Sequence, residues 1–159
     1  MKPLPKHLRP RWRYLALELE SWPETAIDRR ELQEAIWRAG RTLLGDPGSA
    51  KADLRVVECR HDRGRGTGIV RVRRDEVTAA RAAIACVTTL GDEPLGVRVC
   101  GVSGTLRGAR EKYLGRHRQA SGERTVVFED EERMAVEYPD GVDLRTGDSF
   151  TGATQLDLT

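Results

Sequence analysis

The stretch VRVCGVSGTLRGAREKYLGR, residues 97–116, decides how this chain folds. Its first residues alternate between apolar and polar side chains, which is typical of a β-strand. A Gly-Ser-Gly-Thr turn then leads into a segment with Leu106, Ala109 and Tyr113 on one stripe, which predicts an amphipathic helix over 105–115. The start of such a helix has unpaired backbone N–H groups, which suit an anion. The stretch therefore predicts the last strand and helix of a small domain.

Three more strands are predicted upstream of this stretch, at residues 13–20, 53–60 and 69–74. In the first, RYLALELE, three leucines share one face. The third places Val70 and Val72 on one face and Arg71 and Arg73 on the other. The turn HDRGRGTG joins the second and third strands. Because a strand and not a helix follows its glycines, we interpret it as a hairpin loop and not as a dinucleotide site.

Two further helices are predicted between these strands. Asp28 and Glu31 form a capping-box pattern, and an apolar stripe that includes Leu43 predicts a helix ending near Gly45. Asp75 is predicted to cap a second helix, which ends at the glycine of the turn GDEP. The order β-α-β-β-α-β-α predicts an α+β fold, the ferredoxin-like two-layer sandwich of RNA-recognition domains. We expect the first two helices on one face of the sheet and the third on the opposite face or an edge.

Charge is divided unevenly along the chain. Residues 1–118 contain 24 Lys and Arg against 15 Asp and Glu, whereas residues 119–159 contain 3 against 10. Residues 1–11, with three prolines and five basic side chains including one histidine, predict an extended basic arm. We therefore expect the arm, a ferredoxin-like domain at 12–118 and an acidic C-terminal extension at 119–159. For the extension, a marginal hairpin and a partly disordered tail both remain open.

Several functional classes receive no support from the sequence. No run of about 18 apolar residues is present, so no membrane span is expected. The N-terminus lacks the apolar core of a secretory signal, so we expect a cytoplasmic location. Three cysteines without a CxxC favour neither a disulfide scaffold nor a zinc ribbon, and we expect them to be buried thiols that act as small apolar groups. The histidines and carboxylates show neither metal-site spacing nor an acid–base pair, so we expect no bound cofactor, no metal and no catalytic residue.

Basic residues, in contrast, concentrate in three places that suit nucleic acid. These are the arm, the exposed face of the third strand and the polar face of the last helix. The candidate RNA-binding residues are Lys2, Lys6, Arg9, Arg11, Arg13, Arg71, Arg73, Arg107, Arg110, Lys112 and Arg116. The two central strands offer only Tyr14 for base stacking, so phosphate contacts to a folded RNA are favoured over sequence readout.

Three segments of the chain resemble the archaeal ribonuclease P protein component 2 family, a Pop-type subunit of archaea and eukaryotes. They are RPRWRYLALELE at 9–20, GIVRVRR at 68–74 and VRVCGVSGTLRGAREKYL at 97–114, of which the last is the most specific. The resemblance extends over about residues 6–116. It implies a ferredoxin-like protein subunit of ribonuclease P, the ribonucleoprotein that removes the 5′ leader from precursor transfer RNA.

The same resemblance implies how the work is divided within that ribonucleoprotein. The reaction belongs to the RNA subunit and its Mg²⁺ ions, and this chain is non-catalytic. Its partners are the ribonuclease P RNA, ribonuclease P protein component 3 and the other protein subunits, with two copies in a protein subcomplex. Precursor transfer RNA is the substrate of the whole complex.

Two other hypotheses stay open from the sequence alone. One is a different RNA-binding module of translation or RNA processing on the same fold, which binds its RNA without a protein partner. The other is a small-molecule sensor domain of ferredoxin-like fold, in which a ligand raises the melting temperature without salt-sensitive RNA binding.

Overall fold

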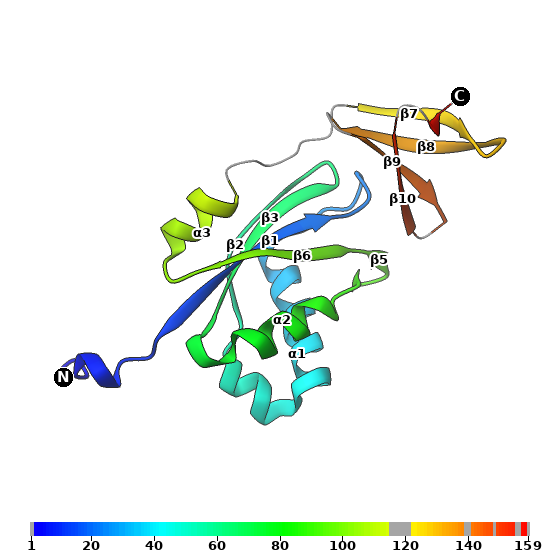
Figure 1. The fold of residues 1–159 in the computed structure, drawn as a ribbon. Helices are drawn as coiled ribbons and strands as arrows, with labels where there is room; N and C mark the ends of the chain where they lie inside the picture. The colour runs from blue at the N-terminus through cyan, green and yellow to red at the C-terminus, as the bar shows by residue number, and fades with distance from the viewer. Residues whose placement is uncertain (1, 115–121, 139–140, 148, 155–156, 159) are drawn as a thin grey trace.

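The main sheet is the centre of the fold. The computed structural model describes residues 2–114, 122–138, 141–147, 149–154 and 157–158. The four strands of the sheet are β1 (Trp12–Glu20), β2 (Arg55–Asp62), β3 (Arg65–Arg73) and β6 (Gly96–Ser103). They are antiparallel and lie in the order β2-β3-β1-β6 (Figure 1).

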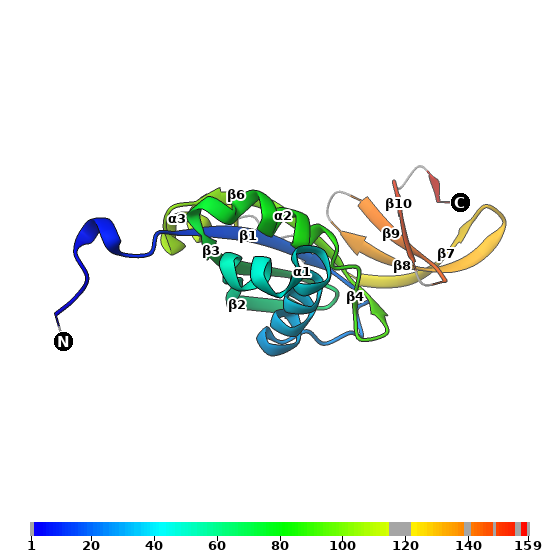
Figure 2. The ribbon, with the colours of Figure 1, turned by 90° about the horizontal axis from the view of Figure 1, so that it is seen from below.

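Two helices, α1 (Arg29–Ala52) and α2 (Val77–Ala85), cover one face of this sheet (Figure 2). The leucines of β1 point to that face and are fully buried against Leu32 and Ile36 of α1 and Ile84 of α2. The capping box at the start of α1 is present, since Asp28 accepts from the Glu31 N–H and Glu31 accepts from the Asp28 N–H. The predicted ferredoxin-like α+β sandwich is confirmed.

The ends of the first two helices differ from the sequence-based expectation. Gly45, with φ of 70°, breaks α1, but the chain turns helical again at once and continues to Ala52. Leu43 precedes this kink and is 48% exposed, so its assignment to the buried stripe was wrong. Helix α2 follows a short 3-10 turn, η2 (Arg74–Glu76), so Asp75 is not its cap. It ends at Ala85, and two short strands follow, β4 (Thr89–Leu90) and β5 (Glu93–Pro94).

The third helix, α3 (Leu106–Tyr113), lies on the opposite face of the sheet from α1 and α2 (Figure 1). Ala109 is fully buried there. The ring of Tyr113 occupies the space above Gly101, where a Cβ atom would lie only 2.3 Å from the ring carbons. A glycine in β6 therefore lets α3 approach the sheet, and the helix fills the surface on which an RNA-recognition domain stacks bases.

The C-terminal extension contains more regular structure than the expected hairpin or disordered tail. Its strands are β7 (Gly122–Phe128), β8 (Glu131–Tyr138), β9 (Gly141–Thr146) and β10 (Ser149–Ala153). They form a second antiparallel sheet in the order β10-β9-β8-β7, called here the C-terminal sheet. Val126, Ala135, Val142 and Leu144 form its small core. The expectation missed β9 and β10 because their apolar residues are few and stand among polar or charged ones.

Two arginines join the C-terminal sheet to the main sheet. Arg65 of β3 donates to Asp143 of β9 over 2.6 Å and lies under the Tyr138 ring, with its Cζ 4.0 Å from the ring centroid. Arg145 of β9 donates to Glu24 over 2.6 Å and stacks on the buried Trp22 ring. These contacts hold the C-terminal sheet at the end of the main sheet opposite to the N-terminal arm (Figure 1).

Candidate nucleic-acid interface

The N-terminal arm extends away from the domain (Figure 1). Its four candidate cations are all exposed: Lys2, Lys6, Arg9 and Arg11. A short 3-10 turn, η1 (Lys6–Leu8), and a hydrogen bond from Arg9 Nε to the Leu4 carbonyl give the arm local shape. It is tied to the domain where the Arg74 N–H donates to the Arg11 carbonyl over 3.0 Å. The arm can therefore place several cations beside the start of β1.

A cluster of two arginines on a tryptophan stands where the arm meets the sheet. Trp12 pairs with Arg73 across β1 and β3, and Arg71 lies one position further along the same face. The Cζ atoms of Arg71 and Arg73 lie 3.9 Å and 4.6 Å from the centroid of the Trp12 ring system. These three residues are called the Trp12 cluster below. The cation–π contacts fix both guanidinium groups in place.

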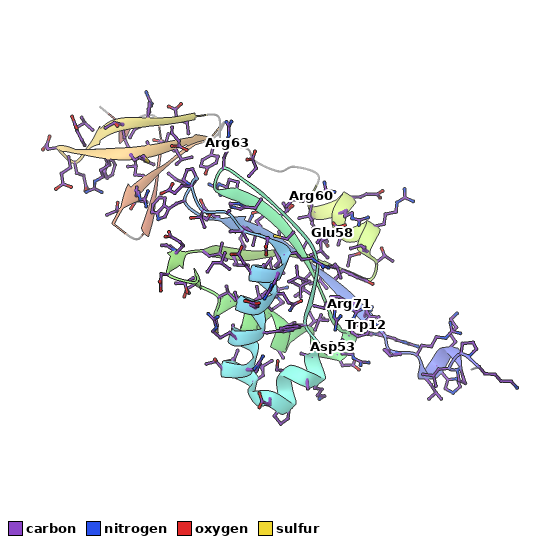
Figure 3. All side chains as sticks on the ribbon, turned by 180° about the vertical axis from the view of Figure 1, so that it is seen from behind. Trp12, Asp53, Glu58, Arg60, Arg63 and Arg71 are labelled. Carbon is purple, nitrogen blue, oxygen red and sulfur yellow. The ribbon has the colours of Figure 1, made fainter. Side chains whose placement is uncertain are left out.

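Among the described residues, the two cations of the Trp12 cluster are not balanced by negative charge nearby. Asp53, which ends α1 in the left-handed conformation, approaches Arg73 only to 3.9 Å. The Nε of Arg71 is buried and has no hydrogen-bond partner in the described part of the chain. Figure 3 shows Trp12, Arg71 and Asp53 together at this end of the sheet. Two preorganised guanidinium groups with unused donor capacity suit a phosphate, which accepts such forked hydrogen bonds.

Arg13 belongs to the same end of the molecule. Its Nη1 donates to the Trp12 carbonyl over 3.0 Å. A Cβ atom on Gly104 would lie 3.8 Å from that nitrogen, so the guanidinium reaches the turn before α3. Arg13 therefore links the Trp12 cluster to the strand-to-helix junction.

The described basic residues of α3 have neighbours within the chain. Arg107 donates to Glu111 over 2.7 Å, and Arg110 donates to Glu58 of β2. The hydrogen bond from Arg110 lowers the pKa of the Glu58 carboxyl. The Lys112 ammonium lies 5.4 Å from the Tyr113 ring centroid. Arg116, the last candidate of this helix, lies outside the described residues.

The junction before α3 is capped by its own side chains. The Thr105 hydroxyl accepts from the Gly108 N–H over 3.0 Å, and the Thr105 N–H reaches the Ser103 hydroxyl at 3.3 Å. Part of the donor capacity expected to meet an anion is thus satisfied within the chain.

Sequence reasoning missed the residues that α3 meets on the sheet. Glu58 and Arg60 lie on β2 next to α3 (Figure 3). The register of β2 against β3 shifts between Val56 and Glu58, and this β-bulge changes which residues face α3. The alternation of apolar and polar residues could not reveal that Glu58 and Arg60 lie beside α3. The run of basic residues after the Gly-Ser-Gly-Thr turn did indicate α3 itself as part of a candidate interface.

Histidine, cysteine and acidic side chains are the residue types that most often bind metal ions. No group of three or more His, Cys, Asp or Glu side chains that could hold a metal occurs in the described ranges. His61 lies 2.9 Å from the buried Ser21 hydroxyl. Burial raises the pKa of the Cys59 thiol to about 11, whereas Cys86 is exposed, against the expectation of buried thiols. Within the part of the chain that the structure describes, no helix is long and apolar enough to cross a membrane.

Comparison with known proteins identifies the family over most of the chain. Residues 13–114 match the Rpp14/Pop5 family. The chain is 52% identical to ribonuclease P protein component 2 of Halorubrum lacusprofundi over 157 residues, which cover 99% of both proteins. It is 49% identical to the protein of the same name from Natronomonas pharaonis, over 99% of this chain and 98% of that one.

A more distant relative matches a smaller part of the chain. Ribonuclease P protein component 2 of Thermococcus gammatolerans is 39% identical over 113 residues, which are 71% of this chain but 91% of the relative. The C-terminal sheet lies beyond the residues that match the family. The chain belongs to the Rpp14/Pop5 family and is a protein subunit of ribonuclease P, with a C-terminal sheet added to the family's domain.

Proposed function

We propose that this subunit contributes RNA-binding surface to ribonuclease P and no catalytic group. The 5′ leader of precursor transfer RNA is cut by the RNA subunit with its Mg²⁺ ions. The chain holds that RNA in its active shape through phosphate contacts. The observation that carries the proposal is the Trp12 cluster, where two guanidinium groups are fixed on an aromatic ring beside an exposed basic arm.

The candidate residues divide into two groups by their present partners. The first group has unused charge and is proposed to contact phosphate directly; it comprises Lys2, Lys6, Arg9, Arg11, Arg13, Arg71 and Arg73. The second group, on α3, has neighbours within the chain and comprises Arg107, Arg110 and Lys112. Arg116, which lies outside the described residues, is proposed to contact RNA with this group. Arg107 exchanges the Glu111 carboxylate for phosphate when RNA binds, which costs part of the binding energy.

The protein partners belong to the same proposal. The chain contacts ribonuclease P protein component 3, and two copies of the chain enter a subcomplex with the remaining protein subunits. The chain acts in the cytoplasm and holds no metal itself, because the Mg²⁺ ions are bound by the RNA. Because α3 covers the base-stacking face, the surface supports contacts to folded RNA and protein over stacking of bases on the sheet.

The test is cleavage of precursor transfer RNA by the ribonuclease P RNA and its other protein subunits at moderate Mg²⁺. We expect cleavage to depend on this chain, and the chain alone to cut nothing. Changing Arg71 and Arg73 together to alanine should raise the Mg²⁺ requirement, whereas Arg81→Ala, on the exposed surface of α2, should not. Equal cleavage with and without the chain would refute the proposal.

A further inference from the structure

A cavity of about 430 Å³ lies where β2, β3 and the C-terminal end of α3 meet. This volume falls within the range of about 300–1,000 Å³ that is usual for small-molecule sites. Arg60 and Asp62 of β2 and Thr67 of β3 line its sheet side, and Leu114 gives it an apolar wall. The ion pair of Glu58 with Arg110 borders it from both elements. The Trp12 cluster does not take part in it.

The β-bulge in β2 aims polar side chains into this cavity. Val56 pairs with Val70 and its side chain is buried in the core under α1. After the register shift, Glu58 pairs with Ile69 and Arg60 with Thr67, on the face that α3 covers. Figure 3 shows Glu58 and Arg60 beside α3. A bulge that turns a carboxylate and a guanidinium toward one space is a feature often found next to binding sites.

The charges around the cavity favour a neutral ligand with both donors and acceptors. Two guanidinium groups, of Arg60 and Arg110, face two carboxylates, of Glu58 and Asp62. Both arginines lower the pKa of the Glu58 carboxyl, so that group stays ionised and can accept hydrogen bonds. Arg60 is exposed and forms no ion pair or hydrogen bond with another described residue. A bare phosphate would meet as much repulsion as attraction here.

Guanine has the hydrogen-bonding edges that this set of groups requires. An arginine can donate in a fork to its O6 and N7 atoms, and a carboxylate can accept from amino and imino N–H groups of a base. An unpaired base in RNA exposes both its Watson–Crick and its Hoogsteen edge. We propose that the cavity binds one unpaired guanine of a single-stranded RNA segment, with Glu58 and Arg110 reading its edges and Leu114 packing on the ring.

The position of the cavity on the surface favours RNA over a free nucleotide. Arg55 pairs with Arg71 of the Trp12 cluster, and Arg60 follows five residues later, about 17 Å along the strand. Figure 3 shows Arg63, Arg60, Glu58 and Arg71 in succession along this side of the sheet. An RNA strand held by phosphate at the Trp12 cluster can therefore reach the cavity. This step rests on the proposed function, since it uses the same RNA-facing side.

The experiment measures binding of the full-length chain to short single-stranded RNA. Fluorescence anisotropy is recorded with uridine heptamers that carry one central guanine, adenine or inosine. We expect the guanine oligomer to bind about tenfold more tightly than the adenine oligomer. Inosine, which lacks the amino group, should fall between them. Equal affinity for all three oligomers would overturn the proposal.

Two variants connect the preference to the cavity. Thr67→Phe fills the space and Glu58→Gln removes the charged acceptor, and each should abolish the guanine preference while leaving the salt dependence of binding unchanged. Glu58→Gln serves if the larger side chain prevents folding, and Arg81→Ala is the control. An unchanged preference in Glu58→Gln would contradict the proposed site.

Two further comparisons distinguish RNA from a free nucleotide as the ligand, and the guanine site from the proposed function. Guanosine monophosphate should bind at least tenfold more weakly than the guanine oligomer; equal binding would make the cavity a free-nucleotide site and overturn the RNA assignment. A lost guanine preference together with normal dependence of cleavage on the chain would refute the cavity alone. Loss of that cleavage dependence would refute the proposed function instead.

Discussion

Arg65 of the main sheet and Asp143 of the C-terminal sheet meet at 2.6 Å, and Glu20 contacts the same guanidinium nitrogen at 2.7 Å. Two carboxylates thus share one arginine at the junction of the two sheets. The Tyr138 ring covers the guanidinium and limits access of water. The junction is therefore a place where protonation changes the balance of charge.

The first prediction concerns the pH dependence of stability. Burial, together with a hydrogen bond to Asp143, raises the pKa of Glu20 to about 7, although Arg65 opposes the shift. In the unfolded chain the pKa is near 4.5. Between these values the folded protein binds a proton that the unfolded one does not, so the free energy of unfolding falls as pH rises from 4.5 to 7.

Urea unfolding measured between pH 5 and pH 8 checks this prediction. Glu20→Gln should remove the decrease, because the amide keeps the hydrogen-bonding shape without titrating. The acids whose pKa is lowered, such as Glu24 and Glu58, titrate below this window and should not interfere. A flat profile in the unchanged protein would show that Glu20 is ionised throughout.

A second prediction tests how the C-terminal sheet is held. Arg145→Ala removes the stack on Trp22 and the ion pair with Glu24. Because Trp22 is buried, we expect a loss of about 1–2 kcal/mol in the free energy of unfolding, mostly from the cation–π contact. Tryptophan fluorescence during urea unfolding measures it. Arg124→Ala, which breaks a partly exposed ion pair with Glu137, should cost less than about 1 kcal/mol.

The third prediction concerns the packing of α3 on the main sheet. In Gly101→Ala the new methyl group meets the Tyr113 ring, so the helix has to move away from the sheet. Overpacking of this kind costs about 1–3 kcal/mol in the free energy of unfolding. Gly152→Ala is the control, because no heavy atom lies within 4 Å of its Cβ position. If Tyr113→Ala does not suppress the effect in the double variant, the clash is not its cause.

A fourth prediction concerns phosphate contacts at the Trp12 cluster. Arg71→Ala should reduce the slope of log affinity against log salt by about 0.7 for the ribonuclease P RNA, the value for one phosphate on a single strand. Filter binding over a range of KCl concentrations measures the slope. Arg81→Ala should leave it unchanged, and an unchanged slope in Arg71→Ala would remove that residue from the interface.

Local patterns predicted much of the main domain. The alternating leucines of β1 and the capping box of Asp28 and Glu31 depend on neighbours within a few residues, and both are present in the structure. The C-terminal sheet was not predicted beyond a hairpin. Its core consists of four small or medium apolar residues whose burial depends on pairing between four strands. Such a weak signal cannot be separated from a charged tail in one sequence.

The candidate interface was predicted as a set of residues but not as an arrangement. The sequence indicated Arg71 and Arg73, and antiparallel pairing of β1 with β3 brings Trp12 beside both arginines. It gave no sign that Arg110 is bound by Glu58, because 52 residues separate the two. Which cations stay available thus depended on contacts between distant parts of the chain.

Hydrophobic period, the capping box of Asp28 and Glu31 and the uneven charge by themselves determined the element order and the basic character of the main domain, and three sequence segments carried the resemblance to the family. These features are local or additive, so they can be recognised from the sequence alone. Only the tertiary structure decided that α3 covers the base-stacking face, that a bulge turns Glu58 toward Arg110, and that Arg65 joins two sheets. Those outcomes follow from packing and desolvation among residues far apart in the chain, where no local pattern carries the information.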